Sequence, residues 1–445
     1  MFHPHTDKDR EEMFKEIGID SFEQLFDYIP EDVRFPNLDL PHTHTEMEAF
    51  NRLYGLQCQN EKGVRMPSFL GAGAYQHFIP AAVDAMISRS EFYSAYTPYQ
   101  PEISQGTLQA MFEYQSHIIN LTGMEVSNAS HYDGATAAAE AVNMGQTIFR
   151  KKRKKVILSP AIHPHYLDTI HTYNAPSDLE IIGDDLPIEE SPEALIPLID
   201  QDTSLVMVQY PDFFGRIYDY IELSRAVHEA GGLFVMVVNP MALGLLKPPS
   251  DFDADIVCGE GQPLGIPVSY GGPYLGILAT KKVYIRSIAG RLIGETVDSD
   301  GKRGYVLTLS TREQHIRRER SSSNICSNQG LMALAATVYL TVLGKEGLKE
   351  VANICYQNAH YAAAEINKLN GFKLWSDETF FHEFVVKCPK TAKEINQKLL
   401  DNEVIGGFEL GTVYKGMDDY LLIAVTETNT KDDIDKLVKI LGEVA

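Results

Sequence analysis

The chain has few cysteines, a single tryptophan and no long uninterrupted apolar run. Its five cysteines, at positions 58, 258, 326, 355 and 388, are dispersed without Cys-x-x-Cys spacing. An odd, dispersed set indicates a reducing compartment and argues against disulfides or a zinc site, so we expect no metal. The N-terminus is too polar for a signal peptide, and no apolar stretch approaches the ~18 residues of a membrane span. These absences predict a cytoplasmic protein without a membrane partner.

Positive charge is also scarce. The chain has 39 Lys and Arg against 61 Asp and Glu, for a formal net charge of −22. Such a balance argues against general nucleic-acid binding and against anionic membranes. The one strong basic run, residues 150–155, follows a predicted helix, where positive charge complements the helix dipole; a nucleic-acid patch is the alternative. We expect the partners to be small molecules or other proteins.

The 445 residues are enough for two domains with sizeable cores. From about residue 107, short apolar runs alternate with helical stretches, which predicts a mainly parallel sheet covered on both faces. The runs lie at residues 156–158, 179–182, 204–209, 233–238, 255–258 and 274–279. The pattern predicts a helical extension over 1–70, a large α/β domain over 71–327 and a small α+β domain over 328–445. A break in the last long helical stretch is expected near Gly344.

Residues 255–276 join a short apolar strand to a polar turn and a glycine-rich run. This segment resembles the cofactor-lysine turn of fold-type-I pyridoxal-phosphate enzymes. Gln262 stands where the lysine would be, and an amide cannot form an imine. We therefore predict a fold-type-I pyridoxal-phosphate-dependent transferase-like fold, with a mainly parallel seven-stranded-type sheet and a smaller α+β domain. Its central chemical group is absent from this chain.

A glycine turn opens a small-residue helix at Gly134, Ala135 and Thr136. Free N–H groups at a helix N-terminus form an anion site, and enzymes of this fold hold the cofactor phosphate there. The alternative is that the small residues only allow close helix packing. If the resemblance holds, this is a vestigial phosphate cradle.

Two further positions stand where residues of this fold class contact the cofactor ring. The strand 233–238 ends in Asn239, where this fold class usually has an aspartate that keeps the pyridine nitrogen protonated. The alternative for Asn239 is a turn residue before Pro240. His163 and His165 flank a proline after strand 156–158; His163 stands where a ring often stacks on the pyridine, whereas a metal site lacks a third ligand.

Two unusual segments carry most of the remaining polar groups. The stretch from 96 to 106 is stiffened by two prolines and suits a rigid loop that presents side chains. The stretch from 311 to 320 has four arginines, which could bind carboxylate or phosphate or pair with Glu313 and Glu319. The candidate partner-site or interface residues in these segments are Tyr96, Tyr99, Gln100, Gln105, Arg312, His315, Arg317 and Arg318.

Several runs together resemble glycine decarboxylase, the P protein of the glycine cleavage system, over nearly the whole chain. The matching runs are Tyr96–Gly106, Thr122–Ser130, Gly134–Ala141, Gln209–Asp212, Lys247–Pro249, Tyr270–Pro273 and Thr311–Cys326. In that family the two homologous halves form one long chain or two separate subunits. This chain is similar to the N-terminal half, which implies subunit 1, the α chain. The family's lysine lies in the other half, so its absence at Gln262 is expected.

The resemblance implies a subunit of glycine dehydrogenase (decarboxylating) that is inactive alone. It implies pyridoxal phosphate on a homologous lysine-bearing subunit, two copies of each subunit, and aminomethyl transfer to the lipoyl arm of the H protein. Two alternatives remain open. An autonomous pyridoxal-phosphate enzyme would need an internal lysine, and no lysine stands in a suitable context. A docking module would recruit the H protein without contributing to the site.

Overall fold

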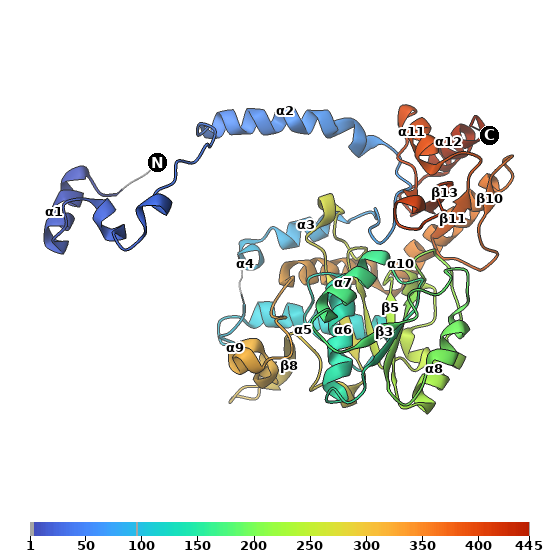
Figure 1. Ribbon diagram of the computed structural model, residues 1–445, viewed down its shortest axis with the longest axis horizontal. Helices are drawn as coiled ribbons and strands as arrows, with labels where there is room; N and C mark the ends of the chain where they lie inside the picture. Colours follow the sequence, from blue (N-terminus) through green and yellow to red (C-terminus); the bar gives the residue numbers. More distant parts are fainter. Residues whose placement is uncertain (1–3, 95–96, 445) are drawn as a thin grey trace. The chain divides into compact units, whose positions relative to one another are not determined.

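The computed structural model describes residues 4–94 and 97–444, and the chain divides into two compact units, Met1–Arg65 and Met66–Ala445. The first unit holds helix α1 (Asp7–Ile17), the 3-10 turns η1 (Phe22–Phe26) and η2 (Glu31–Val33), and the long helix α2 (Glu46–Arg65) (Figure 1). A capping box between Thr6 and Asp9 starts α1, because each side chain accepts a bond from the other's backbone N–H. The domain boundaries within residues 66–445 stay a prediction.

The second unit is built on a seven-stranded sheet with the order β1-β7-β6-β5-β4-β2-β3. Strands β2 to β6 are parallel, whereas β7, next to the edge strand β1, pairs antiparallel with both β6 and β1. The strands are β1 (Val126–Ser127), β2 (Lys155–Leu158), β3 (Glu180–Ile182), β4 (Thr203–Tyr210), β5 (Leu233–Val238), β6 (Ile256–Glu260) and β7 (Gly276–Thr280). The predicted mainly parallel sheet is confirmed.

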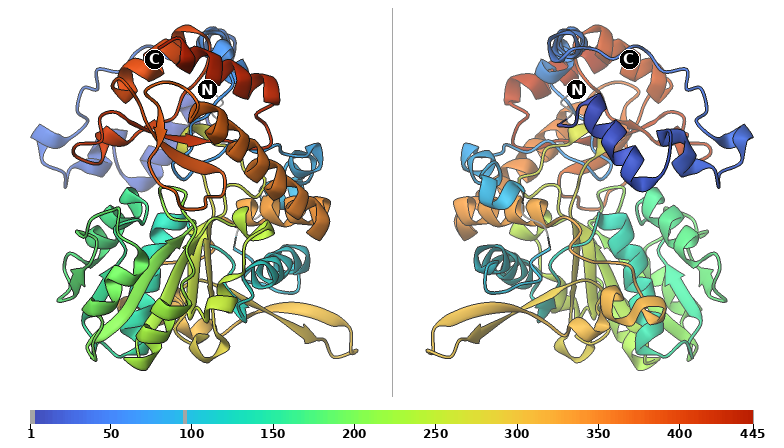
Figure 2. Two further views of the ribbon diagram at one scale, coloured as in Figure 1. Left: turned by 90° about the vertical axis from the view of Figure 1, so that its right-hand side faces the viewer. Right: turned by 90° about the vertical axis from the view of Figure 1, so that its left-hand side faces the viewer.

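Both faces of this sheet are buried because successive side chains of the apolar strands point to opposite sides. On β4, Val206 and Val208 pack with α5 (Gln105–Thr122) and α8 (Ile221–Glu229). The neighbours Leu205 and Met207 pack with α6 (Gly134–Ile148) and α7 (Pro164–Asn174) on the other face. The sheet therefore lies between two helical layers (Figure 2).

A four-stranded antiparallel sheet forms near the C-terminus, in the order β10-β11-β13-β12. Its strands are β10 (Lys373–Leu374), β11 (Glu383–Lys387), β12 (Phe408–Glu409) and β13 (Tyr420–Ala424). Helices α11 (Ala392–Asp401) and α12 (Lys431–Gly442) share one apolar core with it. Thr391 and Thr430 start these helices with capping boxes, which is why each begins sharply after a loop.

Helix α10 (Gly330–Ile366) joins the two cores and is broken at Gly344, whose φ of 62° is non-helical. The break predicted there is confirmed. Among the described residues, α10 is the one helix that meets a length and hydropathy test for a membrane span. Its most apolar window is 44% buried inside the fold, and its alanine-rich face packs in both cores, as in a core helix.

A hairpin of β8 (Leu292–Val297) and β9 (Arg303–Thr308) projects from the large sheet's body (Figure 2). Its base packs on α5, where Ile293 and Tyr305 share a core with Leu108. The remaining helices are α3 (Ala81–Ile87), α4 (Ser90–Tyr93) and α9 (Gln314–Arg317). The remaining 3-10 turns are η3 (Pro192–Leu198), η4 (Ala242–Gly244), η5 (Pro249–Phe252), η6 (Ser269–Gly271), η7 (Lys282–Tyr284), η8 (Ser310–Arg312), η9 (Arg318–Arg320) and η10 (Leu410–Thr412).

The turn after β4 joins the large sheet to the small one. Asp212 accepts from Arg216 Nε at 2.7 Å, and both side chains are at most 4% exposed. Between them Gly215 has a φ of +89°, and a Cβ there would lie 2.0 Å from the carbonyl oxygen of Glu383. Phe381 N donates to the Gly215 carbonyl at 3.3 Å. The junction thus requires a residue without a side chain at position 215.

Gly215→Ala should lower the free energy of unfolding by roughly 3–5 kcal/mol, the upper range for single substitutions. Gly301→Ala is the matched control, because Gly301 also has a positive φ, +77°, but has no atom within 4 Å of an added Cβ. That control should cost only about 1–2 kcal/mol of left-handed strain. Denaturant unfolding measures both values. Equal losses would show that the close approach to Glu383 does not constrain the junction.

Candidate functional site

Gln262 lies just beyond the carboxyl end of β6 and is 1% exposed. Its Nε2 donates to the Tyr75 carbonyl at 2.9 Å and to the Ile266 carbonyl at 2.7 Å, and its Oε1 accepts from Tyr75 N at 2.9 Å. Tyr75 belongs to residues 66–80, a segment between α2 and α3 that we call the strap. The amide at this predicted lysine position therefore has both donors and its acceptor in use.

The N–H groups at the start of α6 also have partners within the chain, the carboxyl groups of Glu260 and Asp133. Glu260 Oε2 accepts from Gly134 N at 2.9 Å, while its Oε1 accepts from Gln262 N at 2.9 Å and Leu275 N at 3.0 Å. Burial raises the pKa of Glu260 to about 8, against the lowering effect of these three N–H donors. Asp133 caps the same helix, because its Oδ1 accepts from Thr136 N at 2.8 Å. Two N–H groups of the predicted cradle thus already meet carboxyl oxygens.

His163 and Asn239 likewise form hydrogen bonds with neighbouring groups of the chain. His163 Nδ1 accepts from His165 N at 3.1 Å, so Nε2 carries the proton and donates to the Ala72 carbonyl at 2.9 Å. Burial lowers the pKa of His163 to about 4, and its ring stacks on Tyr166. Asn239 Oδ1 accepts from Met241 N at 3.0 Å, as in a turn.

The space left between these groups tests whether this chain fits pyridoxal phosphate. A cavity of about 30 Å³ lies among Gly73, His163, Asn239 and Glu260, which is room for about one water. Small-ligand sites are usually ~300–1,000 Å³. An outer hollow of about 410 Å³ does lie before α6, but Asp133 and Glu260 line it and already accept from the Thr136 and Gly134 N–H groups that a phosphate would need. The residues at this site do not fit the cofactor.

The strap is held at further points by buried polar groups. Tyr75 Oη donates to Glu383 Oε2 at 2.5 Å, and Ala72 N donates to Glu383 Oε1 at 2.7 Å. Burial raises the pKa of Glu383 to about 7. Because Glu383 begins β11, these bonds attach the strap to the small sheet, just as the bonds of Gln262 attach it to the large one.

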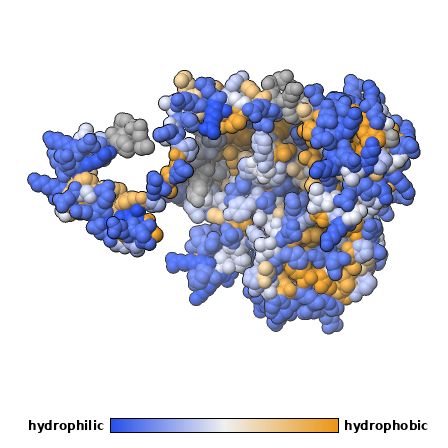
Figure 3. Space-filling model, turned by 45° about the horizontal axis from the view of Figure 1, so that its top comes forward, coloured by the Kyte–Doolittle hydropathy of each residue, from blue (hydrophilic) through white to orange (hydrophobic). Residues whose placement is uncertain are grey.

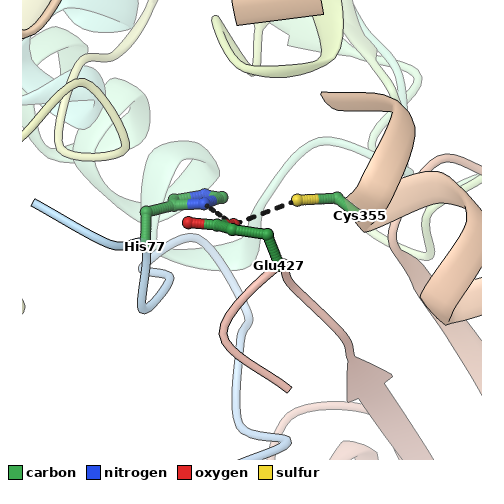
Figure 4. Close-up of side chains that lie close together, drawn as sticks. All are labelled: His77, Cys355 and Glu427. Atoms are coloured by element: carbon green, nitrogen blue, oxygen red, sulfur yellow. Dashed lines mark hydrogen bonds and ion pairs between the residues drawn. The ribbon is translucent and has the colours of Figure 1, made fainter. Parts of the chain in front are cut away.

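Figure 4 shows a third anchor, where His77, Cys355 and Glu427 converge from the strap, α10 and the loop after β13. His77 Nδ1 lies 2.7 Å from Glu427 Oε2, and Cys355 Sγ donates to the same oxygen at 3.2 Å. Such side chains can bind metals, and their ligand atoms lie within 4.8 Å of one another. Burial raises the pKa of the Cys355 thiol, which favours this hydrogen-bonded form.

A second polar cluster surrounds Arg291, a side chain that is 0% exposed. Its guanidinium lies 2.8 Å from Glu313 Oε2 and donates to Tyr99 Oη at 3.0 Å and to Cys326 Sγ at 2.9 Å. It also donates to Ser327 Oγ at 3.0 Å and stacks on the Tyr99 ring. The two segments singled out in the sequence, 96–106 and 311–326, therefore meet at one buried charge.

The predicted interface residues divide into three groups around this cluster. Tyr99 and His315 contact each other at 5.5 Å between ring centroids, and Arg312 donates to three carbonyls, of Leu309, Ile288 and Gly290. Gln105 bonds the β8–β9 hairpin at Tyr305: its Nε2 donates to the Tyr305 carbonyl, and its Oε1 accepts from Tyr305 N. Gln100, Arg317 and Arg318 are exposed, as are Tyr99 and His315. Tyr96 lies outside the described residues.

Sequence reasoning missed two residues that organise these clusters, Glu260 and Arg291. Each is a charged residue inside a short apolar stretch, next to a glycine. A buried charge needs partners, so its position in an apolar stretch was a usable signal. The partners, Gly134 and Glu313, lie 126 and 22 positions away in the chain and could not be named from spacing alone.

Comparison with known proteins identifies the family of this chain. The family model described as "Glycine cleavage system P-protein" matches residues 1–441. The chain belongs to the glycine cleavage system P-protein family. The resemblance inferred from the sequence motifs is thereby confirmed.

Similar proteins agree over the full length. A protein of Thermomicrobium roseum named "Probable glycine dehydrogenase (decarboxylating) subunit 1" is 50% identical, over 100% of this chain and 99% of its own. A crystal structure of glycine decarboxylase (P-protein) of the glycine cleavage system, in inhibitor-bound form, superposes with a TM-score of 0.91 at 39% identity and covers 100% of both chains. A Lactobacillus brevis glutamate decarboxylase has a TM-score of 0.67 at 13% identity, over 93% of this chain and 95% of its own, and shares the fold. The predicted fold-type-I class is confirmed.

Gln262→Lys should not create a pyridoxal-phosphate enzyme. The new side chain cannot replace the three amide bonds with Tyr75 and Ile266, and the ~30 Å³ cavity leaves no room for the cofactor. We expect a loss of about 1–3 kcal/mol in unfolding free energy. Treatment with cofactor and borohydride, followed by peptide mass analysis, should find no adduct at position 262. A stoichiometric adduct there would show that the site can open.

The contribution of Glu260 to the stability of the chain should fall as pH rises from about 4.5 to 8. Because the pKa of Glu260 is raised from 4.5 to about 8, the folded chain keeps a proton that the unfolded chain has released over this range. Glu260→Gln places a donor against Gly134 N and should cost about 1–3 kcal/mol at pH 5. That difference should shrink towards pH 8. Urea unfolding of both proteins across this range measures it, and a constant difference contradicts the raised pKa.

Proposed function

We propose that this chain is the subunit 1 of a glycine dehydrogenase (decarboxylating) and carries no lysine for the cofactor. With a homologous lysine-bearing subunit it decarboxylates glycine and transfers the aminomethyl group to the lipoyl arm of the H protein. The supporting observation is Gln262, whose amide is fully bonded at the lysine position in a chain half identical to a protein named subunit 1. Pyridoxal phosphate, on the partner, supplies the electron sink.

This chain's own contribution is proposed to come from the Arg291 cluster. Arg291 and Glu313 form a buried ion pair that fixes the ends of two loops, and these loops carry Tyr99 and His315 at the surface. Arg317 is exposed on the same short stretch. Guanidinium and imidazole groups suit recognition of a carboxylate such as that of glycine. The side chains of Tyr99, His315 and Arg317 would line the partner's active site, where His315 and Arg317 would bind the negatively charged carboxylate of the substrate.

The expected assembly contains two copies of each subunit and works in the cytoplasm with the lipoylated H protein. Borohydride reduction of the purified heteromeric complex tests where the cofactor is bound. The lysine adduct should lie on the partner polypeptide only. An adduct on this chain would overturn the division of labour between the subunits.

Alanine substitution in the reconstituted complex tests the proposed site. His315→Ala, Arg317→Ala and Arg318→Ala should each leave assembly intact, and at least one should lower glycine decarboxylation by tenfold or more, because a charged contact to substrate is worth about 1.5–3 kcal/mol. Exchange of labelled carbon dioxide with glycine provides the measurement. Arg225→Ala is the matched control, an exposed arginine on α8 paired with Glu222. Unchanged turnover in all three variants would leave the cluster a structural role only.

A further inference from the structure

The first unit of the chain does not bury its apolar side chains within itself. None of the side chains described between residues 4 and 60 is buried. Fourteen large apolar side chains here are exposed, from 41% for Leu25 to 81% for Tyr28. They are Met13, Ile17, Phe22, Leu25, Tyr28, Val33, Phe35, Leu38, Leu40, Met47, Phe50, Leu53, Tyr54 and Leu56. Figure 3 shows apolar side chains on the surface of this segment.

These side chains are nevertheless set in defined local structure. Phe26 packs edge-on against Phe22 and Phe35, at 5.2 and 5.3 Å between ring centroids. Arg34 ties this turn together through Asp27 Oδ1 at 2.9 Å and the Ile29 carbonyl at 2.7 Å. The segment is an ordered arm, which excludes a simple polar tail as its description.

Helix α2 presents an unpartnered apolar stripe. Met47, Phe50 and Tyr54 follow one another at helical spacings of three and four residues, and Leu53 lies beside them. The Phe50 and Tyr54 rings stack nearly parallel, 6.1 Å apart, while both remain more than half exposed. A helix stabilised mainly by packing needs a surface against which to bury such a stripe.

The size of the uncovered surface indicates what could cover it. Burying one aromatic side chain removes about 150–250 Å² from solvent. Covering fourteen partly exposed side chains would remove on the order of 1,000 Å², more than the ~300–600 Å² of the largest patch on a typical monomer. A standard protein interface buries ~800 Å² on each partner. The arm therefore carries enough apolar surface for a stable subunit interface.

Charge indicates which partner fits. Residues 1–65 have 7 Lys and Arg against 14 Asp and Glu, a net charge of −7, and the rest of the chain carries the remaining −15. An acidic arm is disfavoured by charge on its own acidic body and on a second copy of this chain. We propose that the arm, residues 4–60, docks on the lysine-bearing partner subunit, in an apolar groove with a basic rim.

This inference rests on the proposed function only for the identity of the partner. Its test uses the co-expressed complex of both subunits. Phe50→Glu with Tyr54→Glu places two charges in the α2 stripe and should raise the Kd between the subunits at least tenfold. Arg52→Gln with Gln59→Glu, on the opposite face of α2, changes net charge by the same −2 and should alter the Kd less than threefold. Light scattering and a binding titration give these values.

Hydrogen exchange on α2 distinguishes the possible occupants. Amides of residues 47–60 should exchange at least tenfold more slowly in the complex than in this chain alone. Equal protection in the isolated chain at all concentrations would mean that the arm packs on its own body, and protection that rises with its concentration would mean a second copy. Either result, or stripe variants that assemble normally, overturns the inference. A complex that assembles through the arm but does not decarboxylate glycine would instead refute the proposed function and leave the arm's role standing.

Discussion

The pairing of Gln262 with Tyr75 is the constraint on which the rest of the site depends. A lysine at this position would keep its amine available, whereas the amide joins the end of β6 to the strap through two hydrogen bonds with Tyr75 and forms a third with the Ile266 carbonyl. An amide buried to 99% must use its donors and acceptor, since each unpaired group costs about 1–3 kcal/mol. The strap is thereby closed over the edge of the sheet where ligands bind in this fold.

The other buried charges follow from that closure. With the strap in place, Glu260 is shut away from solvent and takes its partners from the α6 N-terminus, and Glu383 takes its partners from the strap itself. The groups at the predicted cofactor site thus hold the polypeptide together. In the proposed function this architecture is a rigid support, and the polar groups that act on the substrate are those of the loops around Arg291.

Those loops and the N-terminal arm share one property, which is that both present exposed charged or apolar side chains. Around Arg291 the charged core is fully enclosed, yet Arg317 and Arg318 extend from it without a buried partner among the described residues. In the arm, ordered aromatic pairs remain in contact with solvent. A subunit that functions only in a heteromeric complex would account for both, because each surface would be finished by another polypeptide.

The sequence by itself determined the fold class and the family, because alternating apolar strands, small-residue helix starts and long motifs are local signals. It also placed Gln262, Asn239 and Gly134 at the ends of their elements. It did not identify Glu260 as the group at the α6 N-terminus or Arg291 as the meeting point of segments 96–106 and 311–326. Those pairings join residues up to about 200 positions apart. Only the tertiary structure decided them, since long-range partners of buried charges are set by packing rather than by spacing.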